Sequence, residues 1–102
     1  AYSSPYGVTK AGVAMLTKSL SMELAERGIR VNAVCPGAVN TPLAAAASFP
    51  KDATPRLIDK LMSFYGFAEP AEIASLVAFI ASDEARYMSG SVVPIDGAQT
   101  AG

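Results

Sequence analysis

The feature that most constrains the fold is a long helical pattern that passes into a strand across one glycine. The spacing of apolar residues predicts a helix from about Tyr6 to Arg27. Gly28 is a natural residue to end this helix, and the β-branched run Ile29–Cys35 that follows predicts a strand. A helix that leads directly into a strand is half of a βαβ unit, in which the strands are parallel. The sequence therefore predicts an α/β fold with a parallel sheet.

A second helix and strand repeat this order nearer the C-terminus. Glu69 and Pro70 open a helix with one apolar stripe, and Ser91–Ile95 predicts a strand after it. Two strands are too few for a stable doubly wound sheet. We therefore interpret residues 1–102 as a portion of one domain, and the start at Ala1, directly ahead of a helix, as the mark of a piece cut from a longer protein.

Tyr6 and Lys10 lie four residues apart at the start of the first helix, and therefore on one face of it. A nearby cation favours the phenolate, so Lys10 is expected to lower the pKa of Tyr6. A tyrosine with a lowered pKa can pass a proton in either direction. The ordinary alternative is an amphipathic tyrosine beside a solvated lysine, and the pair alone does not decide between the two interpretations.

The first helix is apolar on two sides, and one of these sides continues from Tyr6 and Lys10. A helix of this kind is typical of a position between two layers. One layer would be its own sheet, and the other a second helix layer or a partner subunit. A merely well-buried core helix explains the pattern equally well. The two stripes are Val13, Leu16, Leu20 and Leu24 on one side, and Val8, Ala11, Met15 and Met22 on the other.

The loop 36–42 follows the carboxyl end of the first strand, where open α/β sheets bind ligands. Gly37 lets the backbone approach a ligand closely, and Thr41 offers a hydroxyl and can open a helix with Pro42. An ordinary strand-to-helix turn would have the same sequence. Cys35 is expected to be a small buried residue, because no histidine or other base is present to activate it.

The segment from Leu43 to Gly66 is rich in apolar and aromatic residues and is interrupted by prolines. It predicts short helices at about Ala44–Ala47 and Arg56–Phe64. A segment of this kind between two sheet elements is either a mobile lid or ordinary packing.

Composition and charge argue against several classes of function. The chain is 51% hydrophobic with a net charge of -1, so it has no basic field that would attract nucleic acid or anionic lipid. No apolar run is long enough to span a membrane. The absence of histidine excludes histidine-based catalysis and histidine metal sites, and we expect no metal. A single cysteine cannot form an intrachain disulfide, which favours a reducing cytoplasm.

Five short motifs occur in a defined order along the chain. They are Tyr6-x-x-x-Lys10, Arg30-Val31-Asn32-Ala33-Val34, Pro36-Gly37-x-Val39-x-Thr41, Pro70-x-Glu72-Ile73-Ala74, and Ser89-Gly90 before a strand that ends in Asp96-Gly97. Each motif is weak alone, but their order and spacing resemble the C-terminal part of the classical short-chain dehydrogenase/reductase family. The resemblance covers essentially the whole chain. It implies the C-terminal half of a Rossmann-like, doubly wound parallel sheet.

The resemblance also implies an activity, in which hydride moves between an NAD or NADP cofactor and a small-molecule secondary alcohol or ketone. Tyr6 would be the catalytic acid/base. Lys10 would hold the nicotinamide ribose and lower the pKa of Tyr6, so both residues would also contact the cofactor.

The loop after the first strand would form the rest of this cofactor site. Pro36 and Gly37 would shape the loop beside the nicotinamide, and Val39 would bind the carboxamide through its backbone. The Thr41 hydroxyl would contact the carboxamide or the pyrophosphate region. Residues 43–67 match the family's substrate-covering segment, and their bulk implies an apolar wall for the substrate.

The same resemblance implies a homo-oligomer, a dimer or a tetramer, in which the first helix packs against its copy through Val8, Met15 and Met22. The family's glycine-rich turn, its residue that selects NAD or NADP, and its catalytic Ser and Asn would all precede Ala1. We therefore expect the chain to be inactive alone. The alternative is a non-catalytic structural or oligomerisation module of a truncated family member. A nucleotide-binding regulator fits less well, because Tyr6 and Lys10 are both present.

Overall fold

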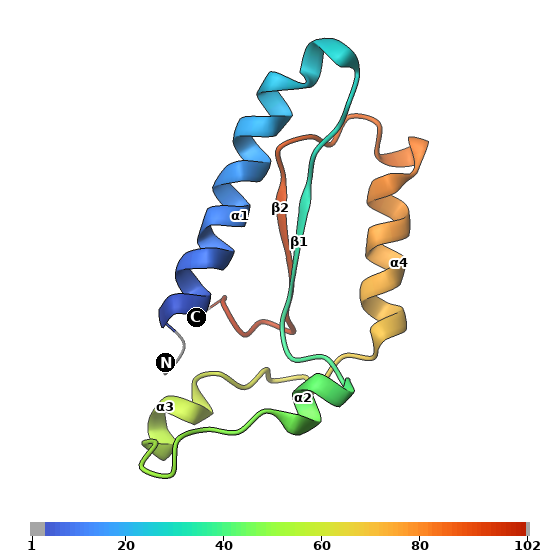
Figure 1. Cartoon of the computed structure of the whole chain (residues 1–102). Coiled ribbons are helices and arrows are strands. Elements are labelled where there is room, and N and C mark those ends of the chain that lie inside the picture. Colours follow the sequence, from blue (N-terminus) through green and yellow to red (C-terminus); the bar gives the residue numbers. More distant parts are fainter. Residues whose placement is uncertain (1–3, 102) are drawn as a thin grey trace.

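The computed structural model describes residues 4–101, which form two parallel strands flanked by helices (Figure 1). The α/β class and the predicted order of helix, strand, short helices, helix and strand are confirmed. No helix within residues 4–101 combines the length and the apolar character needed to cross a bilayer. The elements are α1 (Ser4–Glu23), the 3-10 helix η1 (Ala25–Arg27), β1 (Ala33–Pro36), α2 (Pro42–Ala46), α3 (Pro55–Asp59), α4 (Pro70–Ala81), the 3-10 helix η2 (Asp83–Ala85) and β2 (Val92–Ile95).

The sheet places the carboxyl ends of both strands at one end of the molecule. β1 and β2 pair in parallel, from Ala33 opposite Val92 to Pro36 opposite Ile95. In Figure 1, α1 and α4 flank this sheet, and α2 and α3 lie beyond the carboxyl ends of the strands. The N-terminal end of α1 lies at this same end, because the helix and β1 run in opposite directions. The fold therefore places the start of α1 and the loop after β1 at the same end of the molecule.

The helix α1 buries only part of the predicted stripe: Leu20 and Leu24 are half-buried, and the most buried position lies beside them on the same face. Thr17 is its buried residue, and its hydroxyl donates to the Val13 carbonyl at 2.9 Å. Val13 and Leu16 of the predicted stripe are 53% and 55% exposed. A small side chain suits close packing of a helix on the sheet, whereas the bulky residues need a further layer that residues 4–101 do not supply. The α-helix also ends at Glu23, and η1 completes the last turn.

The prediction for β1 is wrong at its start, because the strand begins at Ala33 and not at Ile29. Before that point one backbone bond remains, from the Gly90 N–H to the Val31 carbonyl at 2.7 Å, and side-chain oxygens accept from two other N–H groups. The Val31 N–H donates to the Ser89 Oγ at 3.2 Å, and the Ser91 N–H donates to the Asn32 Oδ1 at 3.1 Å. The residues ahead of β1 are therefore fixed to the loop before β2 without forming a regular strand.

The prediction for Cys35 is also wrong, because its side chain is exposed. The two strands that the described residues form leave one edge of β1 without a neighbour. The helix expected at Arg56–Phe64 is shorter, and α3 covers only Pro55–Asp59. The Ser63 hydroxyl accepts from the Tyr65 N–H at 3.0 Å, which holds the chain after α3 in a non-helical turn.

The start of α4 follows the predicted signals. Glu69 caps the helix and Pro70 occupies its first turn. The Glu69 N–H donates to Glu72 Oε2 at 2.7 Å, and the Glu69 side chain accepts in return from the backbone of Glu72. This reciprocal pair satisfies N–H groups that a helix start leaves without partners. Of the apolar stripe predicted for α4, Ile80 is buried as expected, whereas Val77 is 47% exposed.

Candidate functional site

Tyr6 and Lys10 lie on the first turns of α1, one above the other. The Lys10 Nζ lies 5.2 Å from the centroid of the Tyr6 ring, and the Tyr6 side chain is 62% exposed. The phenol and the ammonium are therefore neighbours, as helical spacing predicts. A cation at this distance attracts both the face of the ring and the negative charge of a phenolate. The pair therefore presents a hydroxyl and a cation side by side at the start of α1.

Gly37 begins the loop that follows β1, and it lies against the end of β2. Its N–H donates to the Ile95 carbonyl at 3.1 Å. A Cβ at this position would lie 2.8 Å from the Asp96 Cα, a separation that real Cβ atoms do not adopt. Glycine is therefore required here by the backbone of Asp96. The close approach that the structure shows is to the end of β2, and approach of Gly37 to a ligand stays a prediction.

Val39 carries free backbone groups. The Ala68 N–H donates to the Ala38 carbonyl at 2.9 Å, and the Asn40 N–H donates to the Ala68 carbonyl at 2.8 Å. In such a parallel bridge the central residue turns its own N–H and C=O to the opposite side. Within residues 4–101 these two groups of Val39 have no hydrogen-bond partner. They offer one donor and one acceptor, which are the groups that a primary carboxamide requires.

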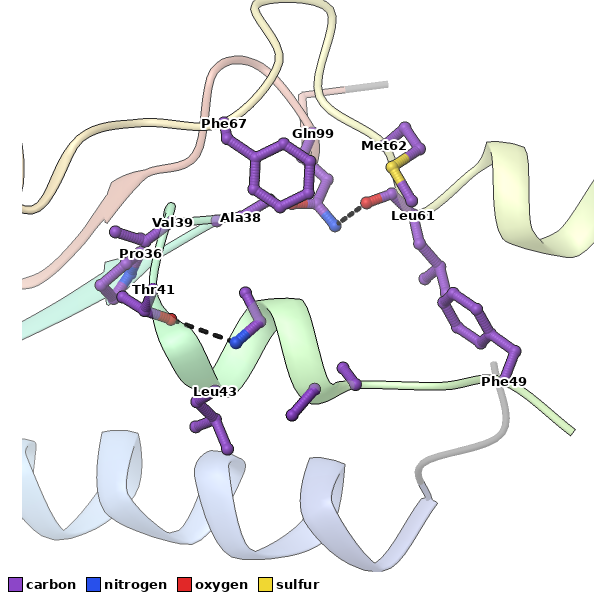
Figure 2. Close-up of a pocket in the computed structure, with 14 residues that line it drawn as sticks. Pro36, Ala38, Val39, Thr41, Leu43, Phe49, Leu61, Met62, Phe67 and Gln99 are labelled. Atoms are coloured by element: carbon purple, nitrogen blue, oxygen red, sulfur yellow. Dashed lines mark hydrogen bonds between the residues drawn. The ribbon is translucent and has the colours of Figure 1, made fainter.

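Thr41 caps α2 and keeps its hydroxyl proton available. The Ala44 N–H donates to the Thr41 Oγ1 at 3.2 Å, so this oxygen acts as the helix cap. The hydroxyl hydrogen can still donate to a ligand. Figure 2 shows this cap at the edge of a cavity.

The loop after β1 lines an apolar cavity of about 710 Å³ (Figure 2). The structure brings the four predicted loop residues, Pro36, Gly37, Val39 and Thr41, into its lining. No charged side chain is among the residues that line it. Tyr6 and Lys10 lie at the same end of the molecule but outside the lining of this cavity. The other lining residues are Ala38, Leu43, Ala44, Ala46, Ala47, Phe49, Leu61, Met62, Phe67 and Gln99.

Gln99 is a lining residue that the sequence did not indicate. Its Nε2 donates to the Leu61 carbonyl at 2.6 Å, across 38 positions of sequence. A polar residue in a turn after a strand has no periodic pattern around it. Only its position shortly after Asp96-Gly97, at the carboxyl end of β2, could have suggested a role.

The loop suits the nicotinamide end of a dinucleotide. A carboxamide could pair with the N–H and C=O of Val39, and the Lys10 ammonium has three donors for ribose hydroxyls. The lining beside Val39 is apolar, which suits the face of an aromatic ring. The residues present therefore fit the group that the sequence resemblance implies.

The sequence is similar to known proteins over nearly the whole chain. A family model described as enoyl-(acyl carrier protein) reductase matches residues 1–100. The 3beta-hydroxysteroid dehydrogenase 1 of Eggerthella lenta is 47% identical over 98 residues, which are 93% of this chain and 36% of that protein.

Solved structures agree with the sequence comparison. A short chain dehydrogenase family protein from Francisella tularensis superposes with a TM-score of 0.76 at 38% identity, over 95% of this chain and 43% of that protein. A 4-hydroxyisoleucine dehydrogenase complexed with NADH and succinate gives 0.76 at 34% identity, over 95% of this chain and 38% of its own. The chain thus spans well under half the length of these relatives. It belongs to the short-chain dehydrogenase/reductase family and represents the C-terminal portion of that fold.

Proposed function

We propose that this chain supplies the nicotinamide side of the active site in an NAD(P)-dependent oxidoreductase of its relatives' length. The reaction would move hydride between the cofactor and a secondary alcohol or ketone. Solved relatives hold NADH or NADP, which supports this cofactor class. The observation that carries the proposal is the Lys10 Nζ, 5.2 Å from the Tyr6 ring at the end of the molecule where both strands end.

In this proposal Tyr6 moves the proton. The bound nicotinamide would supply or accept the hydride. Tyr6 would give its phenolic proton to the carbonyl oxygen when a ketone is reduced, and take the hydroxyl proton when an alcohol is oxidised. The Lys10 ammonium would stabilise the phenolate that remains, because opposite charges attract each other.

The loop after β1 would orient the cofactor. The N–H and C=O of Val39 would hold the carboxamide, and the Thr41 hydroxyl would donate to the carboxamide or the pyrophosphate. Pro36 and Gly37 would set the path of the loop beside the ring. The Lys10 ammonium would bind the ribose hydroxyls from the opposite element.

We infer that the 102-residue chain is inactive alone. It spans 36% of the steroid dehydrogenase and 38% of the hydroxyisoleucine dehydrogenase. The residues that would hold the adenosine end of the cofactor and complete the catalytic set would come from the remainder. Hydride transfer requires both reactants to be held in a defined geometry, and half a site does not provide that.

The test is Tyr6→Phe in the full-length protein that contains this chain. We expect the turnover number with a panel of secondary alcohols and ketones to fall by about 10²- to 10⁴-fold. Binding of NADH or NADPH, followed by cofactor fluorescence, should change little. Tyr87→Phe is the matched control, because Tyr87 is 98% exposed and does not line the cavity beside the loop after β1. Turnover by Tyr6→Phe at the wild-type rate, or by the 102-residue chain alone, would contradict the proposal.

A second candidate function is assembly without catalysis, and one observation favours it. Val8, Met15 and Met22 are 73%, 61% and 78% exposed on α1, which is unusual for large apolar side chains. They would pack against a second copy of the chain in a dimer or tetramer. The two hypotheses separate in the Tyr6→Phe protein, because an assembly module would keep its oligomeric state and have no turnover to lose.

A further inference from the structure

The turn after β2 contacts residues 61–67, which form one wall of the apolar cavity. The Gln99 Nε2 donates to the Leu61 carbonyl at 2.6 Å, and Figure 2 shows this bond at the rim of the cavity. A second bond lies beside it, in which the Ser63 Oγ donates to the Gly97 carbonyl at 2.7 Å. Both bonds are partly buried and join residues 34 and 38 positions apart. The end of the chain is therefore fixed to the segment that lines one side of the cavity.

The contact between Ser63 and Gly97 requires a glycine at position 97. The Ser63 Oγ also accepts from the Tyr65 N–H at 3.0 Å, so one hydroxyl joins three backbone positions. Gly97 has φ +56, and a Cβ at this position would collide with the Ser63 Oγ. Only glycine fits both the backbone conformation and the space.

The turn that carries Gln99 is anchored to β2. The Gln99 N–H donates to the Asp96 carbonyl at 3.1 Å. The Asp96 carboxylate accepts from the Thr100 N–H at 3.1 Å and also from the Thr100 hydroxyl. Gln99 thus extends from a turn that is bonded to the end of β2. Its bond to Leu61 therefore holds the wall in a fixed position relative to the sheet.

The wall itself has little regular structure of its own. The α-helix α3 is five residues long and ends before Leu61. Beyond it, Met62, Phe64 and Phe67 are 45%, 92% and 57% exposed. A wall of this kind keeps its place through contacts with the rest of the chain, and the bonds from Gln99 and Ser63 are such contacts.

We propose that Gln99 and Ser63 are positioning residues that hold the wall at Leu61–Phe67 over the cavity and thereby favour large, neutral, apolar substrates. This inference rests on the proposed oxidoreductase function. Among residues 4–101 no charged side chain lines the cavity, so on this side a charged substrate would lose its hydration without a partner. A long apolar substrate would contact the wall, whereas a short one would not reach it.

The test uses Gln99→Met and Ser63→Ala in the full-length protein. Methionine keeps the length of glutamine without the donor, and alanine removes the hydroxyl. We expect amide hydrogen exchange at residues 61–67 of the unliganded protein to become about five-fold faster in each variant. Ser75→Ala is the matched control, because this hydroxyl donates to the Ala71 carbonyl within α4. Ser63→Thr keeps a hydroxyl and should retain slow exchange.

Kinetics with two neutral alcohols then test the specificity. For 2-decanol the KM should rise about five-fold in both variants with kcat nearly unchanged, while the KM for 2-butanol should stay the same. A general structural defect would instead change kcat and both KM values together.

Unchanged exchange in Gln99→Met and Ser63→Ala would overturn the inference. Equal KM changes for the two alcohols would overturn its specificity part. If the wild-type protein oxidised neither alcohol, the proposed function would fail for this substrate class, and the exchange data would still decide the role of the two residues.

Discussion

Gly37 directly follows β1, and its backbone passes close to Asp96 at the end of β2. A Cβ there would lie 2.8 Å from the Asp96 Cα and 3.0 Å from the Asp96 carbonyl oxygen. Backbone atoms cannot turn aside as a flexible side chain can, so Gly37→Ala should push the strand ends apart. We expect the free energy of unfolding of the full-length protein to fall by about 1–3 kcal/mol, measured by denaturant titration.

A control for Gly37→Ala is available in α1. Apart from its chain neighbours and the backbone of its own helix, no atom of the described chain lies within 4 Å of a Cβ built at Gly12, and alanine favours a helix over glycine by about 1 kcal/mol. Gly12→Ala should therefore leave the free energy of unfolding unchanged or raise it. Equal stability of the Gly37→Ala and wild-type proteins would mean that the end of β2 moves readily, contrary to this prediction.

Asp96 provides a pH-dependent contact in the turn that carries Gln99. The Thr100 hydroxyl, and then the Thr100 N–H, lower the pKa of Asp96 below its ordinary value of 3.8. A carboxyl group with a lowered pKa stabilises the fold above its unfolded pKa, and this contribution is lost as the pH falls through the folded value. The turn should therefore be tight at neutral pH and loosen below about pH 3.8.

The Thr100→Val protein tests this contact. Loss of the hydroxyl should raise the pKa of Asp96 toward 3.8, followed as the carbon NMR shift of the carboxyl group against pH. Thr9→Val is the control, because the Thr9 hydroxyl donates to the Tyr6 carbonyl at the other end of the chain. An Asp96 pKa that is the same in Thr100→Val and wild-type protein would show that the hydroxyl has no effect on it.

At the scale of elements, the order of helices and strands could be predicted because local signals mark their ends. Gly28 adopts φ +68 after η1, Thr41 caps α2, and Glu69 opens α4 with its reciprocal partner. Each signal acts within a few residues, so the sequence contains all that is needed. The parallel pairing of β1 and β2 follows from this order, because a helix leads into each strand.

Boundaries that depend on distant residues could not be predicted. Ile29 and Val31 favour a strand locally, yet β1 begins at Ala33. The Arg30 guanidinium donates to the Ser82 and Met88 carbonyls, and these partners lie 52 and 58 residues later. Such contacts override β propensity, and nothing near Arg30 in sequence indicates them.

The candidate site divides in the same way. One loop carries Pro36, Gly37, Val39 and Thr41, so a rule about the carboxyl ends of strands was enough to bring them together. Helical spacing alone places Lys10 near the Tyr6 ring. Gln99 escaped prediction, because its partner Leu61 is 38 residues away and belongs to an irregular segment.

At the scale of the whole molecule, the chain has more surface than a compact domain of its mass. Its accessible surface is 7778 Å², whereas a folded monomer of this mass would expose about 5,400 Å². Its radius of gyration is 15.8 Å, against about 13 Å for a compact chain of this length. The excess of roughly 2,400 Å² is as large as an obligate interface. Within the described residues the buried hydrophobic core is limited to Ile80 and Ala85.

This excess surface predicts that the 102-residue chain does not fold cooperatively by itself. Two parallel strands and a few buried side chains cannot offset the conformational entropy lost on folding, which is about 1–2 kcal/mol per residue for the backbone alone. On heating, the isolated chain should lose its helical circular dichroism gradually, without a sharp transition, and its β1 and β2 amides should exchange rapidly with solvent. The full-length protein, in which further strands and helices would cover β1 and the exposed side of α1, should melt in one sharp step with those amides protected. A cooperative melt of the isolated chain as a monomer would contradict the prediction. A cooperative melt whose midpoint rises with protein concentration would identify a second copy of the chain as the cover, because association stabilises the folded state by mass action.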